Sequence, residues 1–435
     1  SYDNIQSRLE QGTMSNGIQY GYIEKLNRGD NVNMSFSIRN GDVNSLQNKG
    51  VLPSFTASML NKGTKTRTRQ QIEDELSELK SSIYLSGRGG NAYASISTTK
   101  ENLMACMELM ADMLKNPAFD PAELEKLKTE RLASLEANKT EPQFIASRRL
   151  SEINNKYPKG HPNYVMTIAE EEEAIKALTI EDVKSFYEEF YGLGKSINIG
   201  IGTFEGDKVR AFLEKEFAGF ESKSPYAEVK SPYQGTVVAN ENIITPDKKN
   251  AMTFGAQGVE ISQYSEDYPA LNVAATILGG GFLNSRIADR LRQKDGVSYG
   301  AGGGLSADSD KDDQNSQLYV YAIYNPDNLD KVQLGFKEEI QRYIDGGITE
   351  EELANAVNGW VESQNVSRAK DNELSSLINN NIYYDRDMEF HKEMEEKVSK
   401  LTVEDVNKAI RKYIKPYEQW SVVNAGDYKE TSGSK

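Results

Sequence analysis

The segment LTIEDVKSFYEEFY at Leu178–Tyr191 is repeated as LTVEDVNKAIRKYI at Leu401–Ile414, about 223 residues later. Each copy is followed within a few residues by an apolar segment, INIGIG at Ile197–Gly202 and WSVV at Trp420–Val423. A repeat of this length, with the same type of segment after each copy, indicates one supersecondary unit that occurs twice. The chain is therefore predicted to consist of two halves with the same elements in the same order.

A second pair of similar segments lies upstream at nearly the same offset. FDPAELEKLKTERLASLEAN begins at Phe119, and ITEEELANAVNGWVESQNV begins at Ile348. All four repeated segments start with a side-chain acceptor and a carboxylate three residues later, which is the pattern of a capping box at a helix N-terminus. The pairs are Asp120 with Glu123, Thr179 with Asp182, Thr349 with Glu352, and Thr402 with Asp405. We expect a helix to begin at each pair.

Strands are expected where apolar residues alternate with polar ones. This alternation covers Val32, Met34, Phe36 and Ile38, then Ile197, Ile199 and Ile201, and the second half adds AMTFG at Ala251–Gly255 and LYVYAIY at Leu318–Tyr324. Helical stretches separate the strands, including one with the apolar stripe Leu103, Met107, Met110 and Leu114. Each half is thus predicted to be a mainly antiparallel sheet with helices packed on one side, and the fold class is α+β.

The boundary between the halves is expected in Ser222–Asn250, which is rich in Ser, Pro, Lys and Asn and has few apolar runs. Such a composition is typical of a linker. The predicted domains are residues 1–225 and 226–435. Two domains also suit a chain of 435 residues, because single domains usually contain ~100–200.

Composition excludes several classes of function. With 37% hydrophobic and 27% charged residues, the chain is typical of a globular protein, and no uncharged apolar run of ~18 residues predicts a membrane span. A net charge of −15 opposes binding to nucleic acid, which needs clustered Lys and Arg. The acidic blocks Glu170–Glu173 and Asp308–Asp313 are interpreted as a solvated helix start and a solvated loop. Cys106 is the one cysteine, so no internal disulfide is expected, and its apolar neighbours predict a buried, unreactive thiol.

The segment GVLPSFTASMLNKGTKTRT at Gly50–Thr68 has apolar residues at helical spacing and predicts a short buried helix. It resembles the zinc-site helix of the pitrilysin/insulinase (M16) peptidases, which reads roughly G-x-A-H-F-x-E-H-M-x-F-x-G-T. In that family two His lie one turn apart on one helix face as zinc ligands, and the Glu between them is the general base.

This segment departs from the family pattern at the ligand positions. Counting from Gly50 puts Pro53, Thr56 and Ala57 in the His, Glu and His positions. Counting back from Gly63 instead puts Ser54, Ala57 and Ser58 there. Neither register offers a metal ligand, so no metal site and no cofactor are expected in this chain.

The two histidines of the chain, His161 and His391, are far apart in sequence. His161 lies in the loop GHPNY, which also resembles the family, and is interpreted as a loop hydrogen-bond partner; His391 is interpreted as a surface helix residue. A site with the unconventional ligands Glu130, Glu136 and His161 is disfavoured, because zinc catalysis needs converging ligands and the paired helical His are missing.

The resemblance extends along the chain. TTKENL at Thr98–Leu103 and NPAF at Asn116–Phe119 resemble degenerate first halves of the M16 family, and ILGGGFLNSRIADRLRQKDGVSYGAGGG at Ile277–Gly304 resembles its L-G-G-x-F-x-S-R-L-x-x-x-L-R-E-x-x-G-x-x-Y segment. Arg292 and Tyr299 fall on the Arg/Tyr pair that reaches the zinc site in that family. The fold implied is the metallohydrolase fold shared by LuxS and the mitochondrial processing peptidase.

The resemblance gives this pair two roles, binding of the peptide substrate and assistance to catalysis at a partner's site. A phenol O–H or a guanidinium directed at a developing oxyanion stabilises the transition state more than the ground state. Tyr299 is the candidate oxyanion donor, and Arg292 suits substrate carbonyl or carboxylate groups. From residue types alone, a surface ion pair of the arginine and sheet packing of the tyrosine would be the ordinary interpretation.

Other catalytic patterns are missing. The glycine clusters Gly279–Gly281 and Gly300–Gly304 are not followed by the Lys-Ser/Thr of a phosphate-binding loop and do not form G-x-G-x-x-G. Close helix–strand approach and a turn or bulge explain them. No G-x-S-x-G nucleophile motif is present.

The resemblance therefore implies a non-catalytic half or subunit of an M16 zinc metallopeptidase. It would close the proteolytic chamber, help to bind peptide substrates and act at the zinc of a partner half that carries H-x-x-E-H, either a separate subunit or the N-terminal half of the same precursor. A periplasmic or exported location is expected from bacterial two-half members, although the first residues, SYDNIQSRLEQ, show no secretory signal. The alternative is a structural or peptide-binding protein of the same fold without a proteolytic role.

Overall fold

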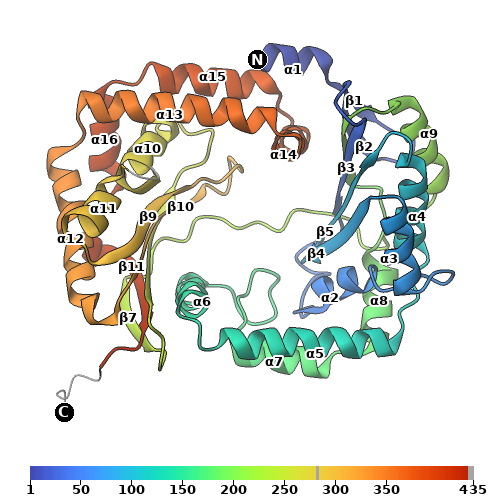
Figure 1. Ribbon diagram of the computed structural model, residues 1–435, viewed down its shortest axis with the longest axis horizontal. Coiled ribbons are helices and arrows are strands. Elements are labelled where there is room, and N and C mark those ends of the chain that lie inside the picture. The colour runs from blue at the N-terminus through green and yellow to red at the C-terminus, as the bar shows by residue number, and fades with distance from the viewer. Residues whose placement is uncertain (281–283, 430–435) are drawn as a thin grey trace. The chain divides into compact units, whose positions relative to one another are not determined.

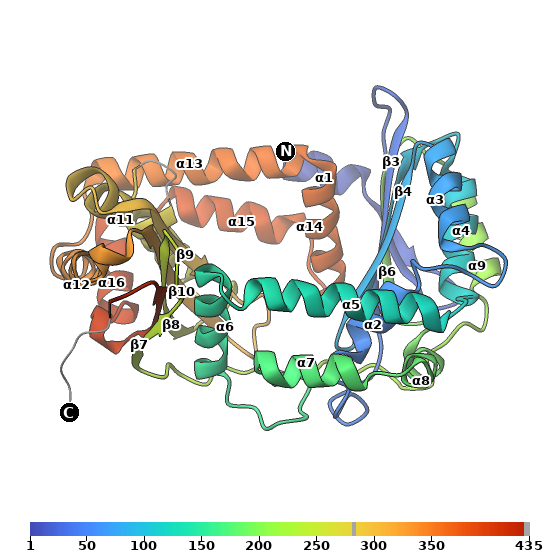
Figure 2. The ribbon, with the colours of Figure 1, turned by 60° about the horizontal axis from the view of Figure 1, so that its bottom comes forward.

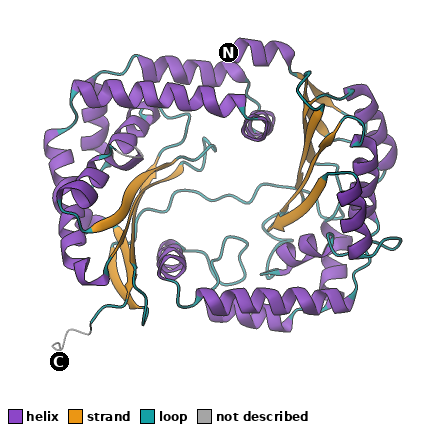
Figure 3. Ribbon diagram, in the orientation of Figure 1, coloured by secondary structure: helices purple, strands orange, loops and turns teal. Residues whose placement is uncertain are grey.

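The computed structural model describes residues 1–280 and 284–429. Its helices and strands form two compact units: unit 1 contains residues 1–133, 158–229 and 364–392, and unit 2 contains residues 134–157, 230–363 and 393–435. In each unit the strands form one sheet (Figure 3). The α+β fold class is confirmed. The predicted domain boundary between residues 225 and 226 stays a prediction, because each unit takes in segments from both halves of the chain.

The sheet of unit 1 has six strands in the order β1-β2-β6-β3-β5-β4. They are β1 (Glu10–Thr13), β2 (Gln19–Glu24), β3 (Asn31–Arg39), β4 (Ser82–Arg88), β5 (Asn91–Thr99) and β6 (Ser196–Gly202). Only the pairing of β2 with β6 is parallel among these strands. A mainly antiparallel sheet was predicted, and the pairing agrees with it.

Helices lie on both faces of this sheet. The helices of unit 1 are α1 (Tyr2–Arg8), α2 (Leu52–Met59), α3 (Arg69–Glu78), α4 (Leu103–Lys115), α7 (Ile168–Ala177), α8 (Ile180–Phe190), α9 (Gly206–Glu216) and α14 (Asp371–Tyr383), together with most of α5 (Pro121–Asn138), whose residues after 133 belong to unit 2. In Figures 1 and 2, α3, α4 and α9 cover one face and α14 lies against the other. Ile197, Ile199 and Ile201 of β6 form a buried cluster with Leu374 and Ile378 of α14. The prediction of helices on one side was therefore incomplete.

The sheet of unit 2 has five strands in the order β7-β11-β8-β10-β9. They are β7 (Ala239–Ile244), β8 (Ala251–Glu260), β9 (Ser298–Ser306), β10 (Asn315–Tyr324) and β11 (Ser421–Gly426). Only the pairing of β11 with β7 is parallel among them. The order and the place of the parallel pair match β2-β6-β3-β5-β4 of unit 1, so the repeat seen in the sequence is a repeat of the sheet.

Helices also lie on both faces of the second sheet. The helices of unit 2 are α6 (Pro142–Asn154), α10 (Tyr268–Ala275), η1 (Thr276–Gly280), α11 (Arg286–Ala288), η2 (Asp289–Lys294), η3 (Pro326–Asn328), α12 (Leu329–Gly346), α16 (Val403–Tyr413) and η4 (Tyr417–Gln419). Most of α13 (Glu350–Ala369) and α15 (Met388–Ser399) also belongs to this unit, while residues 364–369 and 388–392 of these two helices belong to unit 1. Figures 1 and 2 show α11, α12 and α16 on one face and α6 on the other. Ala146 of α6 packs against Val423 and Ala425 of β11. Thus α6, from the first half of the chain, covers the strand that ends the second half.

All four helices begin where the sequence predicts, and three of the four predicted capping boxes are formed in full. Thr179 with Asp182 and Thr402 with Asp405 exchange both hydrogen bonds, and Thr349 with Glu352 does so at 3.1 Å in each direction. The box at Asp120 was wrong: its carboxylate accepts from the Ala122 N–H at 2.9 Å, and Glu123 instead lies 3.5 Å from Arg69. The helix still begins at Pro121.

The linker prediction needs a correction, because Ser222–Asn250 contains strand β7, which pairs in parallel with β11 over six residues. Cys106 is fully buried, as predicted, and its thiol lies 3.5 Å from the Thr98 hydroxyl. Within residues 1–280 and 284–429, no helix has the length and apolar character needed to cross a membrane.

Candidate functional site

Arg292 and Tyr299 lie in unit 2 on consecutive elements. Arg292 belongs to the π-helix η2 and Tyr299 is the second residue of β9, which is an edge strand of its sheet. π-Helical turns are rare and often occur at functional sites. Gly281 to Leu283, part of the glycine-rich segment that carried the resemblance, lie outside the described residues.

Tyr299 occupies a break in the sheet register. In the pairing of β9 with β10, Gly300 lies opposite Ile323 and Ser298 lies opposite Tyr324, so Tyr299 has no opposing residue. The buried hydroxyl of Ser298 lies 2.7 Å from the carbonyl of Gly300 and 2.8 Å from that of Ile323, within reach to donate to either. Bulges of this kind redirect a side chain at a sheet edge. The Tyr299 side chain is 65% exposed.

The segment that contains Arg292 carries three arginines, and two of them are fixed by carboxylates. Arg286 donates two hydrogen bonds to Glu352, at 2.6 and 2.7 Å. Arg290 donates to Asp295 and to Glu338, at 2.6 Å each. These hydrogen bonds raise the pKa of both guanidinium groups. They also hold the backbone on either side of Arg292.

Arg292 differs from these two residues. It is exposed, and within the described part of the chain its guanidinium makes no hydrogen bond or ion pair. The Tyr299 hydroxyl likewise has no partner among residues 1–280 and 284–429. The ordinary interpretation, a surface ion pair and sheet packing, therefore fits Arg286 and Arg290 but not the pair singled out in the sequence. Within the described residues, the Arg292 guanidinium and the Tyr299 hydroxyl are therefore unpaired, while the backbone that carries Arg292 is held by the ion pairs of Arg286 and Arg290.

The glycine clusters allow this segment to lie close to the sheet. A Cβ at Gly279 of η1 would stand 2.6 Å from the backbone nitrogen of Gly303 in β9. One at Gly303 would stand 2.2 Å from the Tyr319 carbonyl oxygen of β10. The predicted close approach of helix and strand is confirmed, and it positions η1 directly against the strand that carries Tyr299.

Helix α2 of unit 1 is the predicted short buried helix. Pro53, Thr56 and Ala57 are buried, and the Thr56 hydroxyl donates to the Leu52 carbonyl at 2.8 Å. Ser54 and Ser58, from the second register, are only partly buried. Neither set contains an imidazole or a carboxylate, so the residues present do not fit a zinc ion.

The described residues also give no support to the unconventional ligand set. Glu130 and Glu136 are exposed residues of α5, and they form no group with His161 that is close enough to hold a metal. The interpretation of His161 as a loop residue is confirmed, because its Nδ1 accepts the Asn163 N–H at 3.0 Å.

The interpretation of His391 as a surface residue was wrong. Its ring in α15 is partly buried, and Nε2 lies 2.7 Å from Oδ1 of Asn381. Burial, reinforced by the positive charges of Arg386 and Arg368, lowers the pKa of His391 to about 4. The imidazole is therefore neutral in the folded protein at pH 7.

The stability of the chain should depend on pH through His391. In the unfolded chain this side chain binds a proton below about pH 6.5, whereas the folded protein resists protonation until about pH 4. Its stabilising contribution is present above pH 6.5 and is lost as the pH falls toward 4, by about 3 kcal/mol. Urea unfolding of the wild type and of His391→Gln, followed by circular dichroism, should show their difference in unfolding free energy changing by that amount between pH 7 and 4. A constant difference contradicts the assignment.

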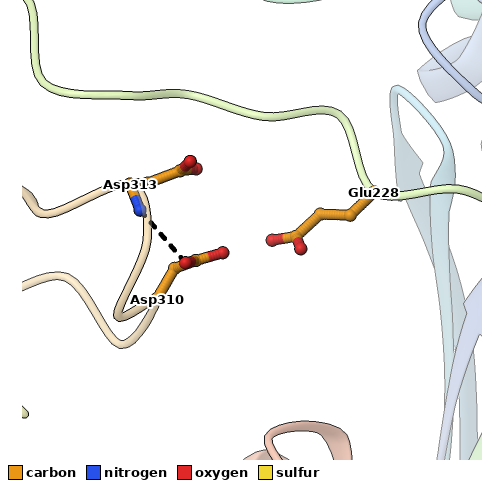
Figure 4. A group of neighbouring side chains, drawn as sticks. All are labelled: Glu228, Asp310 and Asp313. Atoms are coloured by element: carbon orange, nitrogen blue, oxygen red, sulfur yellow. Dashed lines mark hydrogen bonds between the residues drawn. The ribbon is translucent and has the colours of Figure 1, made fainter.

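The acidic loop between β9 and β10 was interpreted as solvated, but Asp310 and Asp313 are buried. Oδ1 of Asp310 accepts from the N–H of Asp313 at 3.1 Å (Figure 4). Its Oδ2 lies 3.2 Å from the Lys230 ammonium, and Asp313 accepts the Ser231 N–H at 2.8 Å. These carboxylates attach the loop to the segment that leads into β7, which is a structural role.

Two domain models of one peptidase family match the chain. Residues 25–164 match the insulinase family, peptidase family M16, and residues 177–359 match the peptidase M16 inactive domain. An uncharacterized zinc protease of Rickettsia felis is 26% identical over 69% of this chain and 70% of its own length. The non-peptidase homolog YmxG of Helicobacter pylori is 21% identical over 86% of this chain and 84% of its own.

Solved structures share the fold. The peptidase M16 inactive domain from Pseudomonas fluorescens superposes with a TM-score of 0.82 at 20% identity, over 98% of this chain and all of that chain. The periplasmic protease PqqL from Escherichia coli superposes with a TM-score of 0.75 at 17% identity, over 98% of this chain but 46% of that one. The chain thus spans about half of the PqqL polypeptide.

Proposed function

Because the chain belongs to the M16 peptidase family, we propose that it is the non-catalytic half or subunit of a zinc metallopeptidase, with Arg292 and Tyr299 acting at a partner's zinc site. The observation that carries this proposal is the contrast within one segment. Arg286 and Arg290 are held by carboxylates, while Arg292 and Tyr299 are exposed and have no partner within the described residues. Arg292 and Tyr299 stabilise no contact within the described part of this chain, and their backbone is fixed by neighbouring residues. Such side chains are suited to contact a substrate or a partner protein.

The chemistry of the two side chains suits peptide hydrolysis. The oxygen of a peptide carbonyl under attack by water gains negative charge, and donors directed at it stabilise the transition state. The Tyr299 O–H donates one hydrogen bond to that oxygen. The Arg292 guanidinium offers several donors in a fixed plane, which suits neighbouring carbonyl or carboxylate groups of the substrate. This chain has no side chain in α2 that would hold the metal itself.

The partner in this proposal is a half that carries H-x-x-E-H, as a separate subunit or as the N-terminal part of one precursor. The match to less than half of PqqL supports an origin in a two-half architecture. The periplasmic setting of that protein supports a periplasmic or exported location here. Peptide substrates would bind in extended form along a sheet edge of the catalytic half, where main-chain hydrogen bonds give affinity with little demand on sequence.

The proposal is tested by separating and recombining the two halves. We expect the purified chain to bind no stoichiometric zinc by metal analysis and to leave casein intact. The zinc-bearing half, identified by co-purification from the native source, should cleave a fluorogenic peptide well only when this chain is added. Zinc retained by the isolated chain together with peptide cleavage would overturn the proposal. A partner unaffected by this chain would favour the alternative, a structural or peptide-binding protein, to which the name of the Helicobacter pylori relative also points.

A further inference from the structure

Arg131 of helix α5 is a partly buried arginine without a carboxylate partner. Its Nη2 donates to the Ser58 hydroxyl of α2 at 3.2 Å, and its guanidinium carbon lies 5.1 Å from the centre of the Phe55 ring. It makes no ion pair with any described residue. By contrast, Arg67 and Arg69 of the same unit each contact two carboxylates.

Among the described residues this lack of a carboxylate partner is shared with the partly buried Arg39, which lies over the Tyr383 ring, whereas Arg149, Arg286 and Arg290 form ion pairs with carboxylates. The protein has 66 acidic and 51 basic residues, so carboxylates are in excess. Partly buried arginines are ordinarily paired, because removing a charge from water is costly unless it is hydrogen-bonded and compensated. Arg131 is held by a hydroxyl and an aromatic face, which position the guanidinium without neutralising it.

A second donor lies beside Arg131. The Ser58 hydroxyl accepts the hydrogen bond from Arg131, and its own O–H has no acceptor among the described residues. Ser54, one turn earlier, donates its hydroxyl to the Val51 carbonyl at 3.1 Å and is thereby engaged. The donors that remain at this junction of α2 and α5 are those of Arg131 and Ser58.

We propose that Arg131 and Ser58 form a binding site for a carboxylate group of a peptide, either its C-terminal carboxylate or an acidic side chain. Two N–H groups of a guanidinium match the two oxygens of a carboxylate, and the serine O–H adds a third donor. A single arginine compensates one negative charge, so a monoanion suits the site better than a dianion in a protein of net charge −15. The site goes beyond the function proposed above, since it requires neither the partner half nor zinc.

The test measures peptide binding to the isolated full chain by fluorescence anisotropy. Three probes with a dansyl label, which carries no carboxylate, are compared: pentaalanine with a free C-terminal carboxylate, the same peptide amidated, and an amidated peptide with glutamate at its centre. We expect the free acid to bind at least about tenfold more tightly than the amidated pentaalanine, because the amide cannot accept the charge-assisted hydrogen bonds that a carboxylate accepts from a guanidinium. Tight binding of the glutamate probe as well assigns the site to carboxylates of either source.

Arg131→Gln should abolish the difference between acid and amide, and Ser58→Ala should reduce it severalfold. The matched control is Arg69→Gln, which removes an already paired arginine of the same unit and should leave the difference intact. Melting curves verify that each variant is folded, and Ser58→Ala remains informative if Arg131→Gln is not. Equal binding of acid and amide by the wild type, or an undiminished difference in folded Arg131→Gln, overturns the proposal. The outcome of this binding test does not change the result expected in the partner-dependent cleavage assay, so the two proposals can fail independently.

Discussion

Replacing Tyr299 by phenylalanine is expected to lower turnover by the reconstituted pair of halves about 10²–10³-fold, the usual effect of removing one oxyanion donor. The substitution removes only the hydroxyl, which has no partner within the described part of the chain. The side chain is 65% exposed, so folding should not change. The measurement is kcat and KM with a fluorogenic peptide, and the loss should appear mainly in kcat, because the donor acts in the transition state.

The control for this experiment is Tyr84→Phe. Tyr84 lies on β4 of unit 1, is 63% exposed and belongs to no part of the proposed site. Its hydroxyl should be dispensable for turnover. Arg292→Ala should also lower kcat/KM, with a contribution from KM because the guanidinium is assigned to substrate groups. If Tyr299→Phe and Arg292→Ala both leave kcat and KM unchanged, the chemistry assigned to the pair is wrong.

The architecture was largely predictable from the sequence because it is repeated. The segments at Leu178 and Leu401 both became helices, α8 and α16, and both lead into a buried strand, β6 and β11. The capping boxes fixed three helix starts because the acceptor and the carboxylate are local, three residues apart. Local signals of this kind do not depend on the rest of the fold.

The errors have a common cause in long-range packing. Strand β7 was placed in a linker because its sequence, ANENII, is polar, and its parallel partner β11 lies at the other end of the chain. The burial of β6 on both faces was missed because α14, which covers one of them, belongs to the other half. His391 became partly buried beside Asn381 for the same reason, since helix neighbours in space are not visible in the sequence.

The candidate site was found by resemblance and not by local pattern. Nothing in the sequence SRIADRLRQKD distinguishes Arg292 from Arg286 and Arg290, because the carboxylates that fix the latter two include Glu352 and Glu338 of distant helices. The bulge at Tyr299 also depends on β10. The glycine clusters, however, did signal the close approach of η1 to β9, since only glycine allows the observed distances.

Two adjacent glycines give the sharpest test of that close approach. Gly279→Ala would place a methyl group 2.6 Å from the nitrogen and 2.8 Å from the Cα of Gly303, which are backbone atoms that cannot rotate away. We expect the unfolding free energy of unit 2 to fall by about 3 kcal/mol, the upper range for overpacking of a core. Because β9 carries Tyr299, turnover in the reconstituted pair should fall as well.

Gly280→Ala should behave in the opposite way. A Cβ there meets its nearest neighbours at 3.6 and 3.7 Å, which is ordinary contact, and replacing a helical glycine reduces the entropy lost on folding. Unit 2 should be unchanged or stabilised by up to about 1 kcal/mol. Both tryptophans, Trp360 and Trp420, lie in unit 2, so urea unfolding followed by tryptophan fluorescence reports on this unit for both variants. Equal stabilities of Gly279→Ala and Gly280→Ala would mean that η1 and β9 are not in backbone contact, and that the support assigned to the Tyr299 strand has another source.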